Sequence, residues 1–486
     1  MNDSIKSKAI HAVSWSSIDT FGRLSIQFVV AIIMARILGP EAFGLIAMLW
    51  IFMSVSYILS GSGYPQALVQ KPHLSELDRS SVFYLMVFFS FILGCIIYFC
   101  APLIGYFYDN QEIIMIMKVM GFIPLIYSFG STHTAILTRN LRFNIQAKAN
   151  LGAVTAGGLV GIYMSYNGYG VWSLVALSIV EEISRSALLW LFHDWKPSFQ
   201  FSLKNLVAMR KYSVNMLLFK LLTSIFENIY FLIIGRLFTP TALGYYYQAN
   251  RLQRIPSTNL TQIVSVVVFP TFSNVQDDKK SLTESITTSM ALLTLFIFPI
   301  MVGLSATSFS FVSVLLSDKW LPSVDYLRLL CLVGLIYPLQ LININLLMAK
   351  AKTDQLFFIE IIKTALTIIA LISTYRFGIE SIILGQIIVS MISFCILSFI
   401  SGRLSEFGTW EQIKTIFPIG FVSAIMGSLV YMLEIVLPFN GLSLLLMQVG
   451  LGITTYSIMC YLFKLKSFKI LLSAVQPRLR LRQLKI

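Results

Sequence analysis

The chain has 486 residues, of which 57% are hydrophobic and only 12% are charged, and its mean hydropathy is +0.79. This composition excludes an ordinary soluble domain and is typical of a polytopic membrane protein. The net charge of +14 would suit a nucleic-acid binder, but the basic residues sort by membrane side, so we expect no nucleic-acid partner.

Apolar runs of about 20 residues, separated by polar residues, predict about fourteen transmembrane helices and an all-α polytopic fold. The first run has no small-residue cleavage site after it and many runs follow it, so it is expected to be a retained span and not a signal peptide. In chain order the expected spans are residues 14–35, 43–68, 82–104, 113–137, 148–166, 170–192, 212–235, 243–269, 287–315, 326–348, 356–375, 379–401, 412–436 and 442–463.

The basic residues predict the orientation of these spans. If the N-terminus is cytoplasmic, most of the 36 Lys and Arg residues lie in inside segments. The positive-inside rule therefore places both termini in the cytoplasm. Residues 466–486 form a basic cytoplasmic tail that is expected to contact lipid headgroups or to act as a topology signal. Only five basic residues fall outside: Arg36, Arg236, Lys319, Arg328 and Arg376.

Two connections, exactly 200 positions apart, indicate an internal repeat. Arg, Pro, Ala and Gly recur in register between Ala35–Gly44 and Gly235–Gly244, and Tyr169–Leu174 resembles Phe377–Ile382 at an offset of 208. Six spans separate the first pair, so both halves enter the membrane from the same side and the repeat is parallel. We therefore expect an N-lobe at 1–200 (spans one to six), a C-lobe at 201–405 (spans seven to twelve) and an extra helix pair at 406–465 (spans thirteen and fourteen).

Four short segments carry a resemblance to a known family: Arg36–Gly44, Leu137–Phe143, Gly170–Leu174 and Phe269–Pro270. Through them the chain resembles the multidrug/oligosaccharidyl-lipid/polysaccharide (MOP) exporter superfamily, and within it the Wzx-type flippases of the polysaccharide transporter family, in the colanic-acid-exporter-like branch. The second lobe departs from the first motif at Thr239–Thr241, so no shared role is carried over from Glu41.

The resemblance implies a non-enzymatic carrier of the bacterial inner membrane. Two MATE-like six-helix lobes would enclose a central cavity and, by alternating access, move a polyprenyl-pyrophosphate-linked oligosaccharide to the outer leaflet for surface polysaccharide synthesis. The implied partners are the lipid-linked oligosaccharide, membrane lipids, and the polymerase and glycosyltransferases of the same pathway.

Seven basic residues lie within the expected spans. Each costs about 2.5 to 3.5 kcal/mol at a helix centre, so such residues usually face a protein interior or a wet cavity. We interpret them as candidate contacts of an anionic substrate: Arg23, Lys118, Arg185, Lys220, Arg251, Arg254 and Lys363.

Arg251 and Arg254, one turn apart in span eight, are the strongest of these candidates. They lie roughly 10 to 15 Å along the helix from Gly244, and two guanidinium groups at that depth suit the paired oxygens of a pyrophosphate. The alternative for other members of the set is a structural ion pair: Asp19 with Arg23, Glu181 with Arg185, and Glu360 with Lys363 stand at helical spacing.

Two carboxylates are candidates for binding a coupling ion, either a proton or sodium. Glu227 follows Lys220 and Thr223 on one face of span seven, and Asp19 shares a stripe with Arg23 and Gln27 in span one. We expect no other cofactor and no metal site, since no metal-ligand spacing occurs.

Two alternative functions remain open. A MATE-like cation-coupled multidrug antiporter would share the two-lobe plan, although six acidic residues against seven basic ones within the spans favour an anionic substrate. A non-transporting scaffold of polysaccharide assembly is the second. An enzyme is disfavoured because outside connections are short, and no P-loop motif for ATP-driven export occurs.

Overall fold

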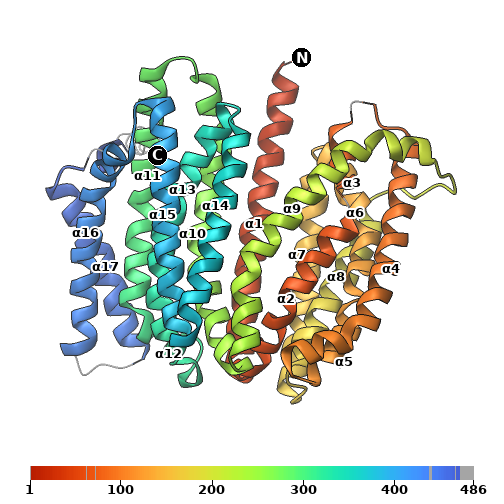
Figure 1. Cartoon of the computed structure of the whole chain (residues 1–486), viewed down its shortest axis with the longest axis horizontal. Coiled ribbons are helices and arrows are strands. Elements are labelled where there is room, and N and C mark those ends of the chain that lie inside the picture. The colour runs from red at the N-terminus through yellow and green to blue at the C-terminus, as the bar shows by residue number, and fades with distance from the viewer. Residues whose placement is uncertain (1, 62, 72, 437–440, 466, 471–486) are drawn as a thin grey trace, which may run out of the picture. The chain divides into compact units, whose positions relative to one another are not determined.

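The computed structural model describes residues 2–61, 63–71, 73–436, 441–465 and 467–470, and the chain is helical almost throughout (Figure 1). Most of the predicted basic tail, 466 and 471–486, lies outside the described residues. In chain order the α-helices are α1 (Asn2–Ile37), α2 (Pro40–Gly61), α3 (Tyr64–Gln70), α4 (Glu76–Tyr108), α5 (Glu112–Met120), α6 (Ile123–Arg139), α7 (Phe143–Tyr166), α8 (Trp172–Phe192), α9 (Leu203–Leu237), α10 (Pro240–Asn274), α11 (Lys279–Ala306), α12 (Ser308–Leu315), α13 (Ser323–Ala349), α14 (Thr353–Thr374), α15 (Ile379–Ser405), α16 (Thr409–Val436) and α17 (Leu442–Leu462), with short 3₁₀ turns η1 (Asp318–Trp320) and η2 (Tyr375–Phe377).

Each of the fourteen predicted spans coincides with a helix or a broken helix. Ten segments in the described part of the chain are long and apolar enough to cross a membrane, and α9 makes an eleventh if its two halves, bent by 43°, count as one span. The expected all-α polytopic fold is confirmed. The fourth expected span is interrupted between α5 and α6, where the chain turns at Gly121 and Phe122.

The described chain forms two compact units, Met1–Gly244 and Tyr245–Ile486. In the N-terminal unit α1 packs on α7, α7 on α8, and α9 lies against α2, α3 and α4. The boundary therefore falls within α10, because the whole of α9 packs in the first unit. These units are defined by contacts, whereas the lobes expected at 1–200 and 201–405 are defined by the repeat, so the lobe boundaries stay a prediction.

A buried carboxylate holds together one end of the N-terminal unit. Asp78, 1% exposed in the first turn of α4, accepts hydrogen bonds from Lys71 Nζ at 2.7 Å, from the Ser75 backbone N–H at 2.9 Å and from Asn205 Nδ2 at 2.8 Å. The Ser75 hydroxyl in turn caps α4 by accepting from the Asp78 N–H. Asp78 thus links the α3–α4 connection to the start of α9.

We expect Asp78→Ala to lower the free energy of unfolding by about 3 kcal/mol, and the melting temperature with it, because a buried carboxylate that accepts several hydrogen bonds is lost. Thermal unfolding in detergent measures this. Glu112→Ala, at an exposed position in the first turn of α5, is the matched control and is expected to change little. Equal melting temperatures for the two variants would contradict a stabilising role for the hydrogen bonds of Asp78.

The two repeated turns meet at the start of α2 and of α10. A side chain on Gly44 would overlap the carbonyl oxygen of Pro240, and one on Gly244 would overlap the carbonyl oxygen of Pro40. The approach is reciprocal, backbone against backbone, and only residues without Cβ permit it. The glycines that recur in the sequence repeat are therefore the residues at which its two copies touch.

In the C-terminal unit the core is built around α11, which packs against α13 and α16. Within this apolar core the side-chain amides of Asn343 (α13) and Gln412 (α16) donate to each other's oxygens at 3.0 and 2.9 Å, and Ser401 (α15) also donates to the Asn343 oxygen. All three are buried. Because each polar group finds a partner, the triad joins three helices without leaving a buried amide unsatisfied.

The last two helices belong to this same core. Ile419 and Val422 of α16 and Cys460 of α17 are buried with residues of α11, and the Tyr456 hydroxyl donates to the Leu295 carbonyl at 2.8 Å. Neighbouring α16 and α17 also pack on each other (Figure 1).

Candidate functional site

Helix α10 has a polar stripe that is buried in the C-terminal unit. Tyr246, Asn250, Gln253, Ser257 and Thr261 recur at intervals of three or four residues and are all less than 9% exposed. The Asn250 amide donates to the Tyr246 hydroxyl at 3.4 Å, and the Gln253 amide donates to the Ser257 hydroxyl at 2.9 Å. Gly334 of α13 has no side chain at the point where the Gln253 amide approaches it. The Tyr246 hydroxyl also donates to Gln386 of α15 at 3.3 Å, so this face of α10 is turned toward the protein interior.

Arg251 and Arg254 lie on a neighbouring face of α10, about a quarter turn from the buried stripe. Arg251 is half-buried and Arg254 is exposed. Both residues also interact with other groups of the chain. The structure thus places two permanent cations one turn apart on α10, beside the face that this helix buries.

A charged cluster lies inside the N-terminal unit, midway along α8. Arg185 forms an ion pair with Glu182, which is 7% exposed, and its guanidinium lies 5.5 Å from the ring centroid of Tyr127 on α6. The Tyr57 hydroxyl of α2 donates to Glu182 Oε1 at 3.4 Å, and the Tyr57 and Tyr127 rings meet edge to face at 5.3 Å. The sequence spacing predicted Glu181 as the partner of Arg185. The ion pair is instead formed with Glu182, which also accepts from Tyr57, while Glu181 lies only within electrostatic range of Arg185.

Glu182→Gln should destabilise the protein by about 3 kcal/mol, because it leaves the Arg185 charge buried without its counterion. The double variant Glu182→Leu with Arg185→Met should recover most of the lost stability, since two apolar side chains of similar volume need no counterion. The melting temperatures of the single and double variants measure this coupling. Lys279→Gln removes an exposed ion pair with Glu406 and serves as the control, with no measurable change expected.

Asp19 and Arg23 of α1 have other partners than the sequence spacing predicted. Asp19 accepts two hydrogen bonds from Asn150 of α7, at 3.0 and 3.2 Å, and no Asp19–Arg23 ion pair occurs in the described part of the chain. Arg23 instead lies within electrostatic range of Glu181 on α8. The Asp19–Arg23 pairing is therefore wrong, and the polar contact of Asp19 joins α1 to α7.

The other candidates are distributed over three helices. Lys363 pairs with Glu360 at 3.1 Å, as predicted. Lys118 of α5 lies 5.0 Å from the ring centroid of Tyr98 on α4. On α9 Lys220 is half-buried, and the exposed Glu227 interacts with other groups of the chain. No group of three or more possible metal ligands occurs among the described residues. The roles of these residues in binding substrate or a coupling ion stay predictions.

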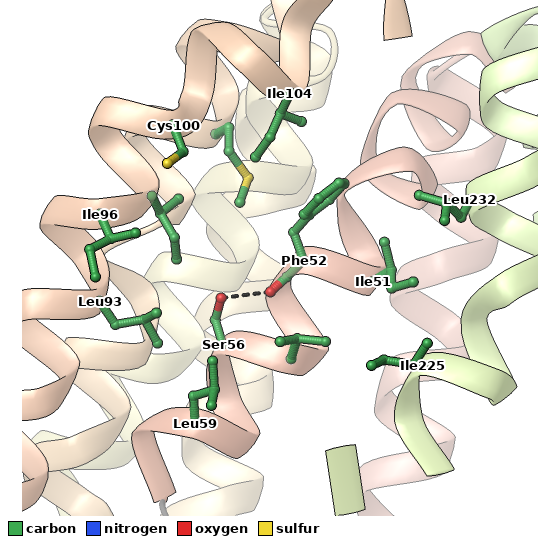
Figure 2. A pocket seen from close by; sticks show the side chains of 13 residues that line it. Ile51, Phe52, Ser56, Leu59, Leu93, Ile96, Cys100, Ile104, Ile225 and Leu232 are labelled. Carbon is green, nitrogen blue, oxygen red and sulfur yellow. Dashed lines mark hydrogen bonds between the residues drawn. The ribbon is translucent and has the colours of Figure 1, made fainter. Parts of the chain in front are cut away.

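The sequence did not indicate an apolar slot in the N-terminal unit, between α2, α4, α5 and α9. Figure 2 shows Leu93, Ile96 and Cys100 of α4 opposite Phe52 and Ser56 of α2. The Ser56 hydroxyl donates to the Phe52 carbonyl at 2.6 Å, so the polar group of this lining residue is satisfied within its own helix. The slot has a volume of about 420 Å³ and almost no polar surface.

Solved structures with the same fold include a flippase and a multidrug transporter. The lipid II flippase MurJ in an inward closed conformation superimposes with a TM-score of 0.77 over 93% of this chain and 98% of its own, at 17% identity. An inward-facing multidrug resistance transporter of the MATE family and MOP superfamily gives 0.62 over 79% of this chain and 99% of its own, at 13% identity. The chain has the same fold as these two transport proteins.

The family model described as "Polysaccharide biosynthesis protein" matches residues 33–325. The chain belongs to this family. It is 25% identical to the lipopolysaccharide biosynthesis protein WzxC of Escherichia coli (strain K12), with 80% of each chain covered. It is also 25% identical to the succinoglycan biosynthesis transport protein ExoT of Rhizobium meliloti (strain 1021), with 68% of this chain and 67% of that protein covered.

Proposed function

We propose that this protein is a flippase that moves a polyprenyl-pyrophosphate-linked oligosaccharide across the bacterial inner membrane for surface polysaccharide synthesis. Membership of the polysaccharide biosynthesis family supports the pathway, and the names of WzxC and ExoT support a transport step within it. The fold shared with a lipid II flippase supports a lipid-linked cargo. The protein acts as a carrier, with no covalent chemistry of its own.

The observation that carries the substrate class is the pair of guanidinium groups on α10. Arg251 and Arg254 stand on one side of α10, next to the polar stripe that this helix buries. A guanidinium stays charged at any physiological pH and binds phosphate oxygens in pairs. Two of them, one turn apart, match the two phosphates that every substrate of this class carries, whatever its sugars are. Lys220 and Arg23 supply further positive charge in the N-terminal unit.

In this proposal the protein works by alternating access, with both termini in the cytoplasm, in line with the distribution of basic residues. The pyrophosphate binds from the inner leaflet, and its negative charge offsets the cost of keeping arginines within the membrane. Glu227 and Asp19 are the carboxylates proposed to bind a coupling proton or sodium ion. The polymerase and glycosyltransferases of the same pathway are the expected partners.

The decisive experiment is reconstitution of the full chain into proteoliposomes that contain a lipid-linked oligosaccharide. A lectin or glycosidase that cannot cross the bilayer then measures how much glycan appears on the far side. We expect time-dependent exposure that empty liposomes lack. An antiporter would instead extrude cationic dyes against a proton or sodium gradient, and a scaffold would give neither signal. Either of these two results would contradict the proposal.

A further inference from the structure

The connection between α8 and α9, residues 193–202, is bonded to the first turns of α4. The Ser198 backbone N–H donates to the Ser80 hydroxyl at 2.9 Å, and the Ser202 N–H donates to the Ser81 hydroxyl at 2.9 Å. Figure 1 shows the connection at the end of the N-terminal unit where α4 begins. The residues that lead into α9 are therefore held against α4 by backbone hydrogen bonds.

Trp195 adds two further contacts to this connection. Its indole N–H donates to Glu76 Oε1 in the first turn of α4 at 2.6 Å, and its carbonyl oxygen accepts a hydrogen bond from His133 Nε2 of α6 at 3.2 Å. The Trp195 and His133 rings also meet edge to face, with their centroids 5.0 Å apart. A ligand that binds here does not have to order the chain first, so little of its binding energy is lost to ordering.

These contacts place the connection at the depth of the lipid headgroups. Helix α4 has 33 residues, a length of about 50 Å, whereas the hydrocarbon core of a bilayer is about 30 Å thick. The first six residues of α4 include three charged groups and two hydroxyls. Phe88, which is 60% exposed, follows Ser80 by eight residues, about 12 Å along the helix axis. Ser80 and Ser81 thus lie near the boundary between headgroups and acyl chains.

The connection and the first turns of α9 expose both apolar and basic side chains. The apolar side chains are Phe199 (100% exposed), Phe201 (51%), Leu203 (68%) and Val207 (60%). The exposed basic side chains are Lys196, Lys204, Arg210 and Lys211. We call these eight residues the α9 entry surface. None of its basic residues is in an ion pair in the described part of the chain, and the sequence has no acidic residue between Asp194 and Glu227.

Helix α9 buries its opposite face in the N-terminal unit. Leu206 and Met209 are 4% and 6% exposed, and they belong to an apolar cluster with Leu68 of α3, Met86 of α4 and Ala135 of α6. The exposed residues at the start of α9 are therefore turned away from the core of this unit, and no side chain of the described chain covers them.

We propose that the α9 entry surface binds the headgroups of anionic phospholipids. Aromatic and other apolar side chains beside lysine and arginine are the combination that binds the boundary between headgroups and acyl chains. The basic residues contact phosphate, and their excess over acidic residues selects lipids with a net negative charge. In the orientation proposed above these lipids belong to the inner leaflet, and this leaflet is all that the inference takes from the proposed function.

The depth of the surface favours lipid over an acidic protein as its occupant. An acidic protein in the aqueous phase would meet the basic side chains, but it would have to displace lipid from the exposed Phe199 and Phe201. Acyl chains beside the lipid-facing Phe88 of α4 can cover these rings without such displacement, which removes apolar surface from water.

Photocrosslinking tests this with the full chain in nanodiscs of 70% phosphatidylcholine and 30% phosphatidylglycerol. The photoreactive residue p-benzoylphenylalanine replaces Phe199 in one preparation and Phe91, 52% exposed on α4, in the other. Mass spectrometry of the lipid adducts gives the ratio of the two phospholipids at each position. At position 199 phosphatidylglycerol should exceed its share of the bilayer at least threefold. At position 91 we expect the bulk ratio, since α4 has no basic residue after Arg79.

Two pairs of substitutions identify the charges responsible. Lys204→Gln with Lys211→Gln, in the chain with the probe at position 199, should return the adducts to the bulk composition, and 0.5 M sodium chloride should lower the enrichment in the unchanged chain, because salt screens exposed charges. Lys279→Gln with Lys280→Gln removes two exposed lysines at the start of α11 and should leave the ratio unchanged. Melting temperatures establish that both double variants are folded.

Bulk composition of the adducts at position 199, or the same enrichment at both probe positions, would overturn the inference. Enrichment that persists in the folded Lys204→Gln, Lys211→Gln variant would do so too, because the basic residues would then not be its source. In living cells, a crosslink from position 199 to a protein in place of lipid would assign the surface to a protein partner and would also overturn it. None of these measurements depends on transport, so failure of a lipid-linked oligosaccharide to cross the bilayer would contradict the proposed function alone.

Discussion

Replacing both Arg251 and Arg254 with Gln should weaken binding of a polyprenyl pyrophosphate by at least 100-fold and abolish export. Each charge-assisted contact to a phosphate contributes about 1.5 to 3 kcal/mol, and each 1.4 kcal/mol is a tenfold change in affinity. Gln keeps a hydrogen-bond donor but has no charge and no forked geometry, so neither contact is preserved. Binding is measured by competition with a fluorescent polyprenyl pyrophosphate, and export by surface polysaccharide.

The controls separate a lost ligand contact from a general loss of positive charge. Arg376→Gln removes an exposed guanidinium that lies against the Tyr375 ring in η2, and it should leave binding unchanged. Arg251→Lys with Arg254→Lys keeps the charge, and it should recover part of the affinity, because an ammonium group cannot bind two oxygens in a fixed fork. Normal export by a well-folded double Gln variant would remove these arginines from the substrate site.

Gly44→Val and Gly244→Val should each destabilise the protein by about 3 kcal/mol or more, the upper range for overpacking a tight contact. The obstructing atom in each case is a backbone carbonyl oxygen, of Pro240 or Pro40, which cannot move aside as a flexible side chain can. The two helix starts would have to separate. Yield of folded protein and melting temperature in detergent measure the effect, and Ala at the same positions should show a smaller effect of the same sign.

Gly39 provides the matched control for these substitutions. It lies in the connection that precedes Pro40, and a Cβ at this position would meet nothing within 4 Å. Gly39→Ala should therefore be neutral or slightly stabilising, because Ala restricts the unfolded chain. If Gly44→Val and Gly39→Ala had the same melting temperature, the close approach of α2 and α10 would not contribute to stability.

The transmembrane fold was predictable because hydropathy over 20 residues reports burial in lipid directly. Interruptions of spans were harder to predict. The break at Gly121 and Phe122 has Lys118 before it and Pro124 after it, but mean hydropathy over 20 residues averages such local signals away. The recurring glycines were visible as a repeat, but their physical reason, reciprocal contact with Pro40 and Pro240, appears only in three dimensions.

The sequence indicated the charged candidate residues, but it did not indicate which groups they pair with. Glu181 and Glu182 both stand at helical spacing from Arg185, and the choice is made by Tyr57 from another helix. The apolar slot had no sequence signal at all, since it arises where side chains of four helices fail to fill a shared volume. Arg251 and Arg254 stay a prediction as substrate contacts, because their geometry allows pyrophosphate binding without requiring it.

The attachment of α16 and α17 matters for anyone who engineers this chain. Arg328 of α13 lies 3.4 Å from Glu434 of α16, and the Asn343–Gln412 amide pair crosses to the same helix. Truncation after residue 405 would therefore strip a counterion and an amide partner from α13 and uncover the apolar flank of α11. A minimal twelve-helix version would need new surface residues at these positions, and affinity tags or fluorescent fusions belong beyond the final helix.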